Sequence, residues 1–534
     1  MAIDHINCVC ALYFMSGVVA PGAPDIPGVV CFVSVRESGV KTSDSGKWEL
    51  GMRDSLDKIH QTSMSLIENV GVRLHHREIV ELVRNSSVKV VGDVVFFTRK
   101  QLMAEVEKIP AQFRIFGRNS KYDMVIGNGS TEYSAGYGCP SIINGDGTRR
   151  NGLMADYVNL LKLVHVFPGF HLNGGILVQP SDISVDKANL LMTYATAAFS
   201  DKCIMGQPGT AEEVAEVMAF LNILFGEKSE LIDKPRIIAL VNTLSPMQID
   251  RNSLDTISLY ASHGQPLVIS SGVMTGTTSP ATLAGSIAQA NAEALVGMAI
   301  AQMIRAETPV VMGINATPVD MRTGGVNVGS PLQAIALKYC VGLARMYGVP
   351  IRCGGASSNA NGVTAQSGYE SMLNMFVTLD QEVDLIIHSA GILDGYSAMS
   401  YEKFITDLEV IGLAERYFRD ITINEDSLAR DVIEEVVGRG QFLTHRHTMN
   451  NCRKESWISD IATSGTLTDA VSPCEQFSAK INTKLKKMLG AYEVPFLEQS
   501  VHDTIKSFLR ESGVRKTDMQ HVQAMFSDGD SPAI

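Results

Sequence analysis

The feature that most limits the fold of this chain is a unit that recurs at intervals of 29 to 43 residues. Each unit has a short apolar run rich in β-branched residues, a turn rich in Gly, Ser, Asn or Pro, and a stretch with helical apolar spacing. The apolar runs are residues 172–178, 202–206, 237–241, 266–271, 309–313, 350–354 and 384–388. Strands that alternate with helices lie parallel and are joined by right-handed crossovers. The pattern therefore predicts an α/β fold with a parallel sheet covered by helices.

Seven runs are visible, and residues 133–144 supply an eighth about one unit before the first. Eight units predict a (β/α)8 TIM barrel. An open doubly wound sheet is the alternative, but no G-x-G-x-x-G follows a first strand. We expect four regions along the chain: a leader without stable structure at 1–51, an N-terminal α/β cap at 52–130, the barrel at 131–460 and a C-terminal helical extension at 461–534.

Composition excludes several classes of protein. The formal net charge of -12 over 534 residues disfavours binding to nucleic acid, which needs clustered Lys and Arg. Nine scattered cysteines favour reduced thiols and a cytoplasmic location over a disulfide framework. The first basic residue is Arg36, so the apolar start lacks the basic flank of a signal peptide. The apolar run 281–304 is interrupted by polar side chains and predicts a buried helix, so we expect no membrane association.

Candidate site residues follow the predicted strands, because the loops at the carboxyl ends of barrel strands carry the active site. His388 ends an apolar run, and Gln366 and Glu370 share one face at a helix start, which makes these three the candidate catalytic residues. The candidate substrate-binding residues are polar or aromatic side chains expected at the mouth: Tyr137, Asn173, Asn242, Ser271, Asn315, Tyr369 and Tyr396. Turn formation, helix capping and packing are the more ordinary explanations for any one of them.

Other chemistries are disfavoured by the motifs. His445, His447 and Cys452 would share a metal only if a strand placed both histidines on one face, and no further ligand has suitable spacing, so no metal site is predicted. There is no Walker loop and no G-x-S-x-G. A barrel aldolase or lyase needs a lysine or a carboxylate pair at strand ends, whereas Lys202 begins its strand.

Seven segments, in this order along the chain, are similar to those of one known family. They are IHQTSMSLIENVGV (59–72), FGRN (116–119), TSPATLAG (278–285), DMRTG (320–324), QSGYE (366–370), HSAG (388–391) and FLTHRHT (442–448). The stretch from about Met52 to Trp457 resembles the trimethylamine methyltransferase family. The founding branch carries pyrrolysine in the loop after the sixth strand. Residues 354–360 of this chain contain only ordinary amino acids there, so the chain resembles the branch without pyrrolysine.

The resemblance implies a methyltransferase that moves a methyl group from a methylated amine, similar to glycine betaine, to Co(I) of a corrinoid protein. The corrinoid would be carried by that partner, with no cofactor bound tightly by this chain, and homo-oligomers are compatible with it. A catalytically degenerate member that binds amines or a partner is the alternative.

A quaternary ammonium departs as a neutral amine, so its methyl transfer needs no proton. The protein would orient the methyl carbon, exclude water and hold the cation. Tyr133, Tyr137, Tyr369 and Tyr396 are candidates for an aromatic cage. His388 as an imidazolium, or backbone N–H groups at a turn, would receive a substrate carboxylate, and no arginine is singled out for this role.

Overall fold

The computed structural model describes residues 45–438, 440–464 and 472–527. The chain divides into two units, Met1–Arg53 and Asp54–Ile534. Helix α1 (Ser45–Asn69) begins inside the predicted leader, so residues 45–51 are helical. The prediction for residues 1–44 lies outside the described residues. The boundaries expected at 130 and 460 stay predictions.

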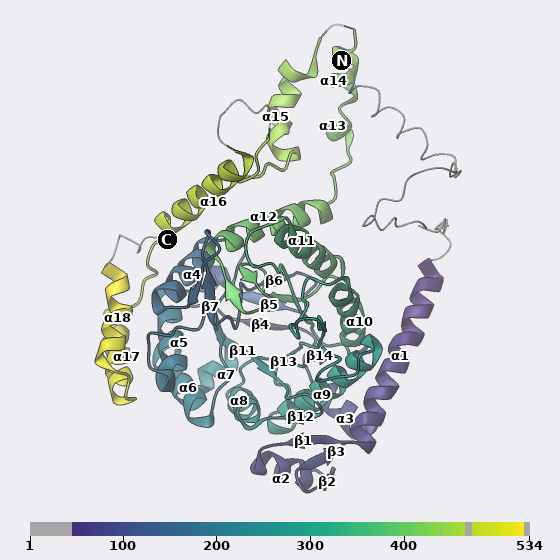
Figure 1. The fold of residues 1–534 in the computed structure, drawn as a ribbon, viewed down its shortest axis with the longest axis vertical. Helices are drawn as coiled ribbons and strands as arrows, with labels where there is room; N and C mark the ends of the chain where they lie inside the picture. Colours follow the sequence, from purple (N-terminus) through teal and green to yellow (C-terminus); the bar gives the residue numbers. More distant parts are fainter. Residues whose placement is uncertain (1–44, 439, 465–471, 528–534) are drawn as a thin grey trace. The chain divides into compact units, whose positions relative to one another are not determined.

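Strands and helices alternate through the second unit as the sequence predicted, which makes this a mixed α/β fold. Each of the eight predicted runs overlaps a strand. These strands are β6 (Glu132–Tyr133), β9 (Leu172–Gly174), β10 (Cys203–Gly206), β11 (Ile237–Asn242), β13 (Leu267–Ser270), β15 (Val310–Met312), β17 (Arg352–Gly354) and β18 (Leu385–Ile387). The helices that follow them are α4 (Met154–Val166), α5 (Ala188–Phe199), α6 (Ala211–Phe225), α8 (Arg251–Ser262), α9 (Leu283–Ile304), α10 (Pro331–Tyr347), α11 (Ala365–Asp380) and α12 (Tyr401–Phe418). Figure 1 shows these helices arranged around the strands.

All pairings among these eight strands are parallel. Five strands pair in the order β15-β13-β11-β10-β9 and three in the order β17-β18-β6. A parallel bridge between Met312 and Ile351 connects β15 with the start of β17. Beyond β6 and β9, Gly138 N donates to Ile176 O at 2.7 Å. Hydrogen bonds therefore join neighbours along the whole series of strands.

The apolar core among these strands follows the two-residue period of β-structure. Leu172, Met205, Leu240 and Leu385 belong to one buried cluster, together with residues of the hairpin β4 (Phe113–Ile115) and β5 (Met124–Ile126). Arg352 pairs in register with Leu385 of this cluster. A charged side chain thus begins a strand whose neighbour contributes to the core.

The N-terminal layer is joined to a loop of the central fold. Strands β1 (Val72–Leu74), β2 (Lys89–Val91) and β3 (Val94–Phe96) form a sheet in the order β12-β1-β3-β2, with α2 (Arg77–Asn85) and α3 (Arg99–Val106) beside them in sequence. Its edge strand β12 (Gln248–Ile249) comes from the loop after β11 and runs parallel to β1. The layer consequently contains residues about 175 positions apart, as the pair Arg73 and Gln248 illustrates.

The loops after β6 and β18 form a second small sheet. Its order is β19-β20-β7-β8, from Ile392–Leu393, Ala398–Met399, Ser141–Ile143 and Arg149–Asn151. Ile143, Leu393 and Ala398 pack with Ala360 from the loop after β17. Three loops that follow adjacent strands are therefore held together at one end of the fold.

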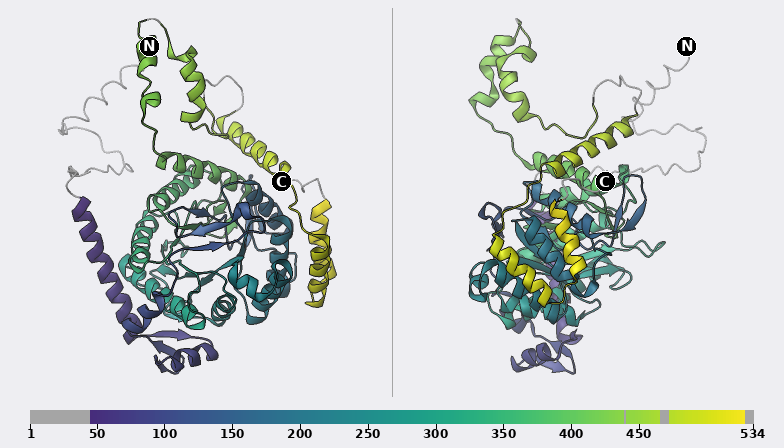
Figure 2. Two further views of the ribbon diagram at one scale, coloured as in Figure 1. Left: turned by 180° about the vertical axis from the view of Figure 1, so that it is seen from behind. Right: turned by 90° about the vertical axis from the view of Figure 1, so that its left-hand side faces the viewer.

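Helices complete the second unit. α9 is the one described helix that is long and apolar enough to cross a membrane. Its apolar 18-residue stretch is 89% buried inside the protein, so α9 is the buried helix that the sequence predicted for residues 281–304. α16 (Pro473–Gly490) contacts α12 and α4, while α17 (Gln499–Glu511) contacts α6 and α18 (Lys516–Ser527) contacts α4. Figure 2 shows α17 and α18, in yellow, outside the helices that surround the strands.

Candidate active site

Arg352 and His388 form the centre of the candidate site. Arg352 is 5% exposed and His388 is 8% exposed. Arg352 Nη2 lies 2.8 Å from His388 Nδ1, and His388 Nε2 lies 3.1 Å from the carbonyl oxygen of Tyr137. A guanidinium can only donate, so Nδ1 accepts and the ring proton sits on Nε2, where it is donated to Tyr137. His388 is therefore neutral and fixed in one tautomer.

Electrostatics support the same assignment. Burial, and then the positive charge of Arg352, lower the pKa of His388 well below its usual value. The expectation that His388 would receive a carboxylate as an imidazolium is wrong for this reason. Burial also lowers the pKa of Arg352, but a guanidinium stays protonated in proteins.

The charge of Arg352 has no anionic partner in the part of the chain that the structure describes. No Asp or Glu there forms an ion pair with it, and its buried Nε has no hydrogen-bond partner. The hydroxyl of Tyr137 is also buried without a partner. Unpaired buried polar atoms are rare and costly, and a buried charge without a counterion costs several kcal/mol. The Nε of Arg352 and the hydroxyl of Tyr137 are donors that a bound anionic group could satisfy.

Two aromatic rings stand beside His388. The ring of Tyr396 lies 4.7 Å from the imidazole and that of Tyr137 lies 6.5 Å from it, centroid to centroid. Burial raises the pKa of both phenols, so both rings are neutral. His388 and Tyr396 have φ values of 68° and 73°, in the left-handed region that bulky residues rarely adopt. Such strain gathers at functional sites, where the surrounding structure holds it in place.

Glu370 organises the loop after β17. Its carboxylate accepts from Ser358 Oγ at 2.6 Å, from Asn359 N at 2.8 Å and from Gln366 Nε2 at 2.9 Å. Gln366 and Glu370 do share one face at the start of α11, as the sequence indicated. Both form hydrogen bonds within the protein, and the bonds of Glu370 to Ser358 and Asn359 hold the loop after β17.

Lys403 and Asp407 also stabilise the loop after β17. They form a fully buried ion pair on α12. Lys403 Nζ also donates to Ala356 O at 3.0 Å, and Asp407 accepts from Gly391 N at 2.8 Å. Burial raises the pKa of Asp407 to about 6 even though Lys403 lowers it. The pair fixes the backbone of the loops after β17 and β18 relative to each other.

Glu293 stabilises the loop after β11 through hydrogen bonds. This buried carboxylate on α9 accepts from Thr243 Oγ1, Ser245 Oγ and Ser271 Oγ at 2.6 to 2.8 Å, and from the backbone N–H of Met247 at 2.8 Å. Ser271, predicted to bind substrate, thus has its hydroxyl committed to Glu293 in this structure.

The other predicted residues are not gathered around His388. Asn173 is buried and bonded to Leu161 O at 3.0 Å, because the alternation along β9 turns it away from the side of Leu172. Asn242 is exposed at the end of β11, and Asn315 Oδ1 accepts from Gln333. Tyr369 is 64% exposed, and Tyr133 Oη donates to Glu415 at 2.8 Å.

The histidine pair near the C-terminal end lies on a helix. His445 caps α15 (Arg446–Glu455) by accepting from His447 N at 3.1 Å, and Cys452 is exposed on that helix. The strand that would have placed both histidines on one face is not formed. Among the described residues, no group of three or more His, Cys, Asp or Glu could hold a metal ion.

Comparison with known proteins gives a consistent set of similarities. A family model for trimethylamine methyltransferase (MTTB) matches residues 37–518. The glycine betaine methyltransferase of Desulfitobacterium hafniense (strain Y51) is 35% identical over 467 residues, covering 88% of this chain and 98% of that protein. The proline betaine:corrinoid methyltransferase of Eubacterium limosum is 25% identical, covering 85% and 96%. The L-carnitine:corrinoid methyltransferase of the same organism is 24% identical, covering 76% and 85%.

Among solved structures, the monomethylamine methyltransferase of Methanosarcina barkeri is similar with a TM-score of 0.44 at 10% identity. The match covers 87% of this chain and 88% of that chain.

Proposed function

Because this chain belongs to the trimethylamine methyltransferase family, we propose that it transfers a methyl group from a quaternary amine that carries a carboxylate to a corrinoid protein. The three betaine and carnitine methyltransferases to which it is similar act, by name, on amines of this class. The observation that carries the proposal is the buried Arg352, whose charge lacks an anionic partner among the described residues.

Arg352 holds the carboxylate of the substrate. A guanidinium presents parallel N–H donors that match a carboxylate, and the free Nε is one of them. His388 is a positioning residue, because it accepts from Nη2 and so fixes the plane of the guanidinium. The unpartnered hydroxyl of Tyr137 supplies a further donor.

Tyr396 and Tyr137 hold the quaternary ammonium through their ring faces. Each cation–π contact contributes about 0.5–2 kcal/mol, more where water is excluded. Because both phenols are neutral, the contact comes from the rings themselves and no phenolate pairs with the ammonium. Gln366 and Glu370 do not contact the substrate in this proposal. They hold the loop after β17 in its conformation.

The corrinoid of the partner protein supplies a reduced cobalt that accepts the methyl group. On this chain, the task is to anchor the carboxylate, to orient the methyl carbon outward and to exclude water. No protein group has to protonate the amine, because it leaves neutral.

The proposal also includes the closure of the barrel and the location of the protein in the cell. We infer that the eight parallel strands close as a (β/α)8 barrel, supported by the hydrogen bond from Gly138 N to Ile176 O. A cytoplasmic location is supported by buried free thiols such as Cys203 and Cys353.

The test combines binding with turnover. Glycine betaine, proline betaine, carnitine, choline and trimethylamine are titrated calorimetrically into the purified protein. The best ligand is then incubated with reduced corrinoid protein, and methyl-cobalt absorbance is followed. We expect binding of a carboxylate-bearing amine, little binding of choline, which matches the ammonium but lacks the carboxylate, and formation of methyl-cobalt.

Three other outcomes have distinct meanings. Choline or trimethylamine binding as tightly as the betaines would refute the role of Arg352. A betaine that binds without transfer to any corrinoid protein would favour a degenerate, amine-binding member. Transfer from none of the five amines, with none bound, would refute the proposed substrate class.

A further inference from the structure

Exposed apolar side chains are concentrated in one short part of the chain. We call residues 419–458 the α13–α15 segment, which contains α13 (Glu425–Leu428), α14 (Arg430–Val436) and α15. It has 40 of the 534 residues but 10 of the 26 large hydrophobic side chains that are exposed in the described chain. Ile423, Leu443 and Met449 are 72%, 77% and 73% exposed, and Val436 is its one buried large apolar residue. So many exposed large apolar side chains in one short segment indicate an interaction surface.

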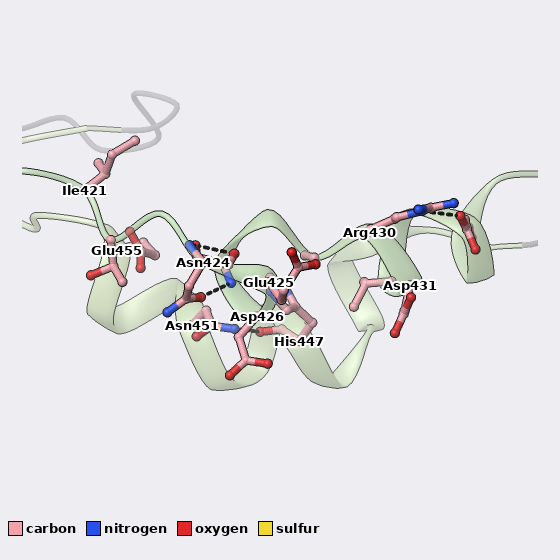
Figure 3. Close-up of a pocket in the computed structure, with 14 residues that line it drawn as sticks. Ile421, Asn424, Glu425, Asp426, Arg430, Asp431, His447, Asn451 and Glu455 are labelled. Atoms are coloured by element: carbon pink, nitrogen blue, oxygen red, sulfur yellow. Dashed lines mark hydrogen bonds and ion pairs between the residues drawn. The ribbon is translucent and has the colours of Figure 1, made fainter.

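The segment is also poorly packed within itself. A hollow of about 940 Å³ lies between α13 and α14 on one side and α15 on the other. Figure 3 shows carboxylates of Glu425, Asp426, Asp431 and Glu455 among its lining residues. Protein interiors are close-packed, so a helical segment with an open acidic hollow and exposed apolar residues is incomplete by itself.

The charges of the segment are self-complementary. Residues 425–436 carry five acidic side chains and one arginine. Residues 446–455 carry Arg446, Arg453 and Lys454 against a single acid, Glu455. A twofold contact brings the same surface of two copies together, so that the acidic half of each meets the basic half of the other. An acidic hollow does not suit an anionic lipid surface, which attracts basic segments.

We propose that the α13–α15 segment is a dimerisation element that pairs with the same segment of a second copy. Arg453 and Lys454 of each copy face the acidic hollow of the other, and Ile423, Leu443 and Met449 are buried between them. A standard interface takes about 20–30 residues from each side, and the segment has 40.

The test is the mass of the full chain in solution, measured by light scattering during gel filtration. We expect a dimer of the unchanged protein. The double variant Asp431→Lys/Glu434→Lys and the double variant Arg453→Glu/Lys454→Glu are each expected to be monomeric, since each brings like charges together. Glu78→Lys/Glu81→Lys on the exposed face of α2 is the matched control and stays dimeric.

Mixing the two monomeric variants is the decisive measurement. In the mixed dimer, the new lysines of the first variant meet the new glutamates of the second, and the unchanged basic half of the first meets the unchanged acidic half of the second. The mixed dimer should therefore form with an association constant at least tenfold higher than that of either variant with itself. That gain cannot come from misfolding of either variant. A monomeric wild type, dimers that survive both charge reversals, or two monomers that do not combine would each overturn the proposal. So would dimerisation that depends on residues 1–44 and not on these charges.

Discussion

Replacing Arg352 by methionine should weaken betaine binding strongly and leave the protein folded. Methionine keeps much of the length of the side chain but removes the buried charge and all its donors. Loss of one partner from a buried, hydrogen-bonded charge pair costs about 2–5 kcal/mol. At about 1.4 kcal/mol per tenfold, the dissociation constant for glycine betaine rises roughly 30-fold to several thousandfold.

The free protein should respond quite differently to the same change. His388 Nδ1 loses its donor, and an unsatisfied buried acceptor costs about 1–3 kcal/mol. Removing a buried guanidinium that lacks an anionic partner returns several kcal/mol. The two effects are of opposite sign, so the free energy of unfolding without ligand should stay the same or increase.

Calorimetry for affinity and urea unfolding without ligand measure the two halves of this prediction. Arg73→Met is the control, because Arg73 forms a half-exposed ion pair with Asp93 in the N-terminal sheet, and surface pairs contribute little. Betaine affinity of folded Arg352→Met within about threefold of wild type would refute carboxylate binding by Arg352. A loss of more than about 3 kcal/mol of stability without ligand would refute the reasoning about an uncompensated charge.

Two further predictions concern the rings beside Arg352. Tyr396→Leu should weaken betaine binding by about 0.5–2 kcal/mol in calorimetry while Tyr396→Phe keeps it, and equal losses in both would contradict a ring-face contact. His388 resists protonation in the fold, so below pH 6.5 the unfolded chain takes up a proton that the folded chain does not, and stability falls with pH. The stability advantage of wild type over His388→Gln should therefore shrink by about 1.4 kcal/mol between pH 7.5 and 5.5 in urea unfolding, and an unchanged gap would disprove it.

The order of strands and helices was predictable because apolar periodicity and turn residues are local signals. His388 was singled out in the same way, as the polar residue directly after the apolar run that forms β18. Asn173 was misplaced although the signal was present. Leu172 faces the core cluster, so the alternation along β9 points its neighbour the other way.

The residues that sequence reasoning missed depend on distant parts of the chain. Arg352 is a charged residue within an apolar run and could have been noticed in the sequence. Its importance, however, depends on the absence of a carboxylate from the neighbouring strands, which only the structure shows. In the sequence, Glu293 stands out only as a polar break in an apolar helix. Its partners Thr243 and Ser245 lie about 50 residues earlier and come near only when the strands assemble.

The pairing of β12 with β1 has a consequence for how the protein is made. The N-terminal sheet takes its edge strand from Gln248–Ile249, so a nascent chain cannot complete it until nearly half of the protein has left the ribosome. β6 must likewise wait for β18, more than 250 residues later. Such distant pairings slow folding and prolong the exposure of unpaired strand edges. The N-terminal sheet and β6 can thus be completed only late in synthesis, and their strands stay open to wrong pairing until then.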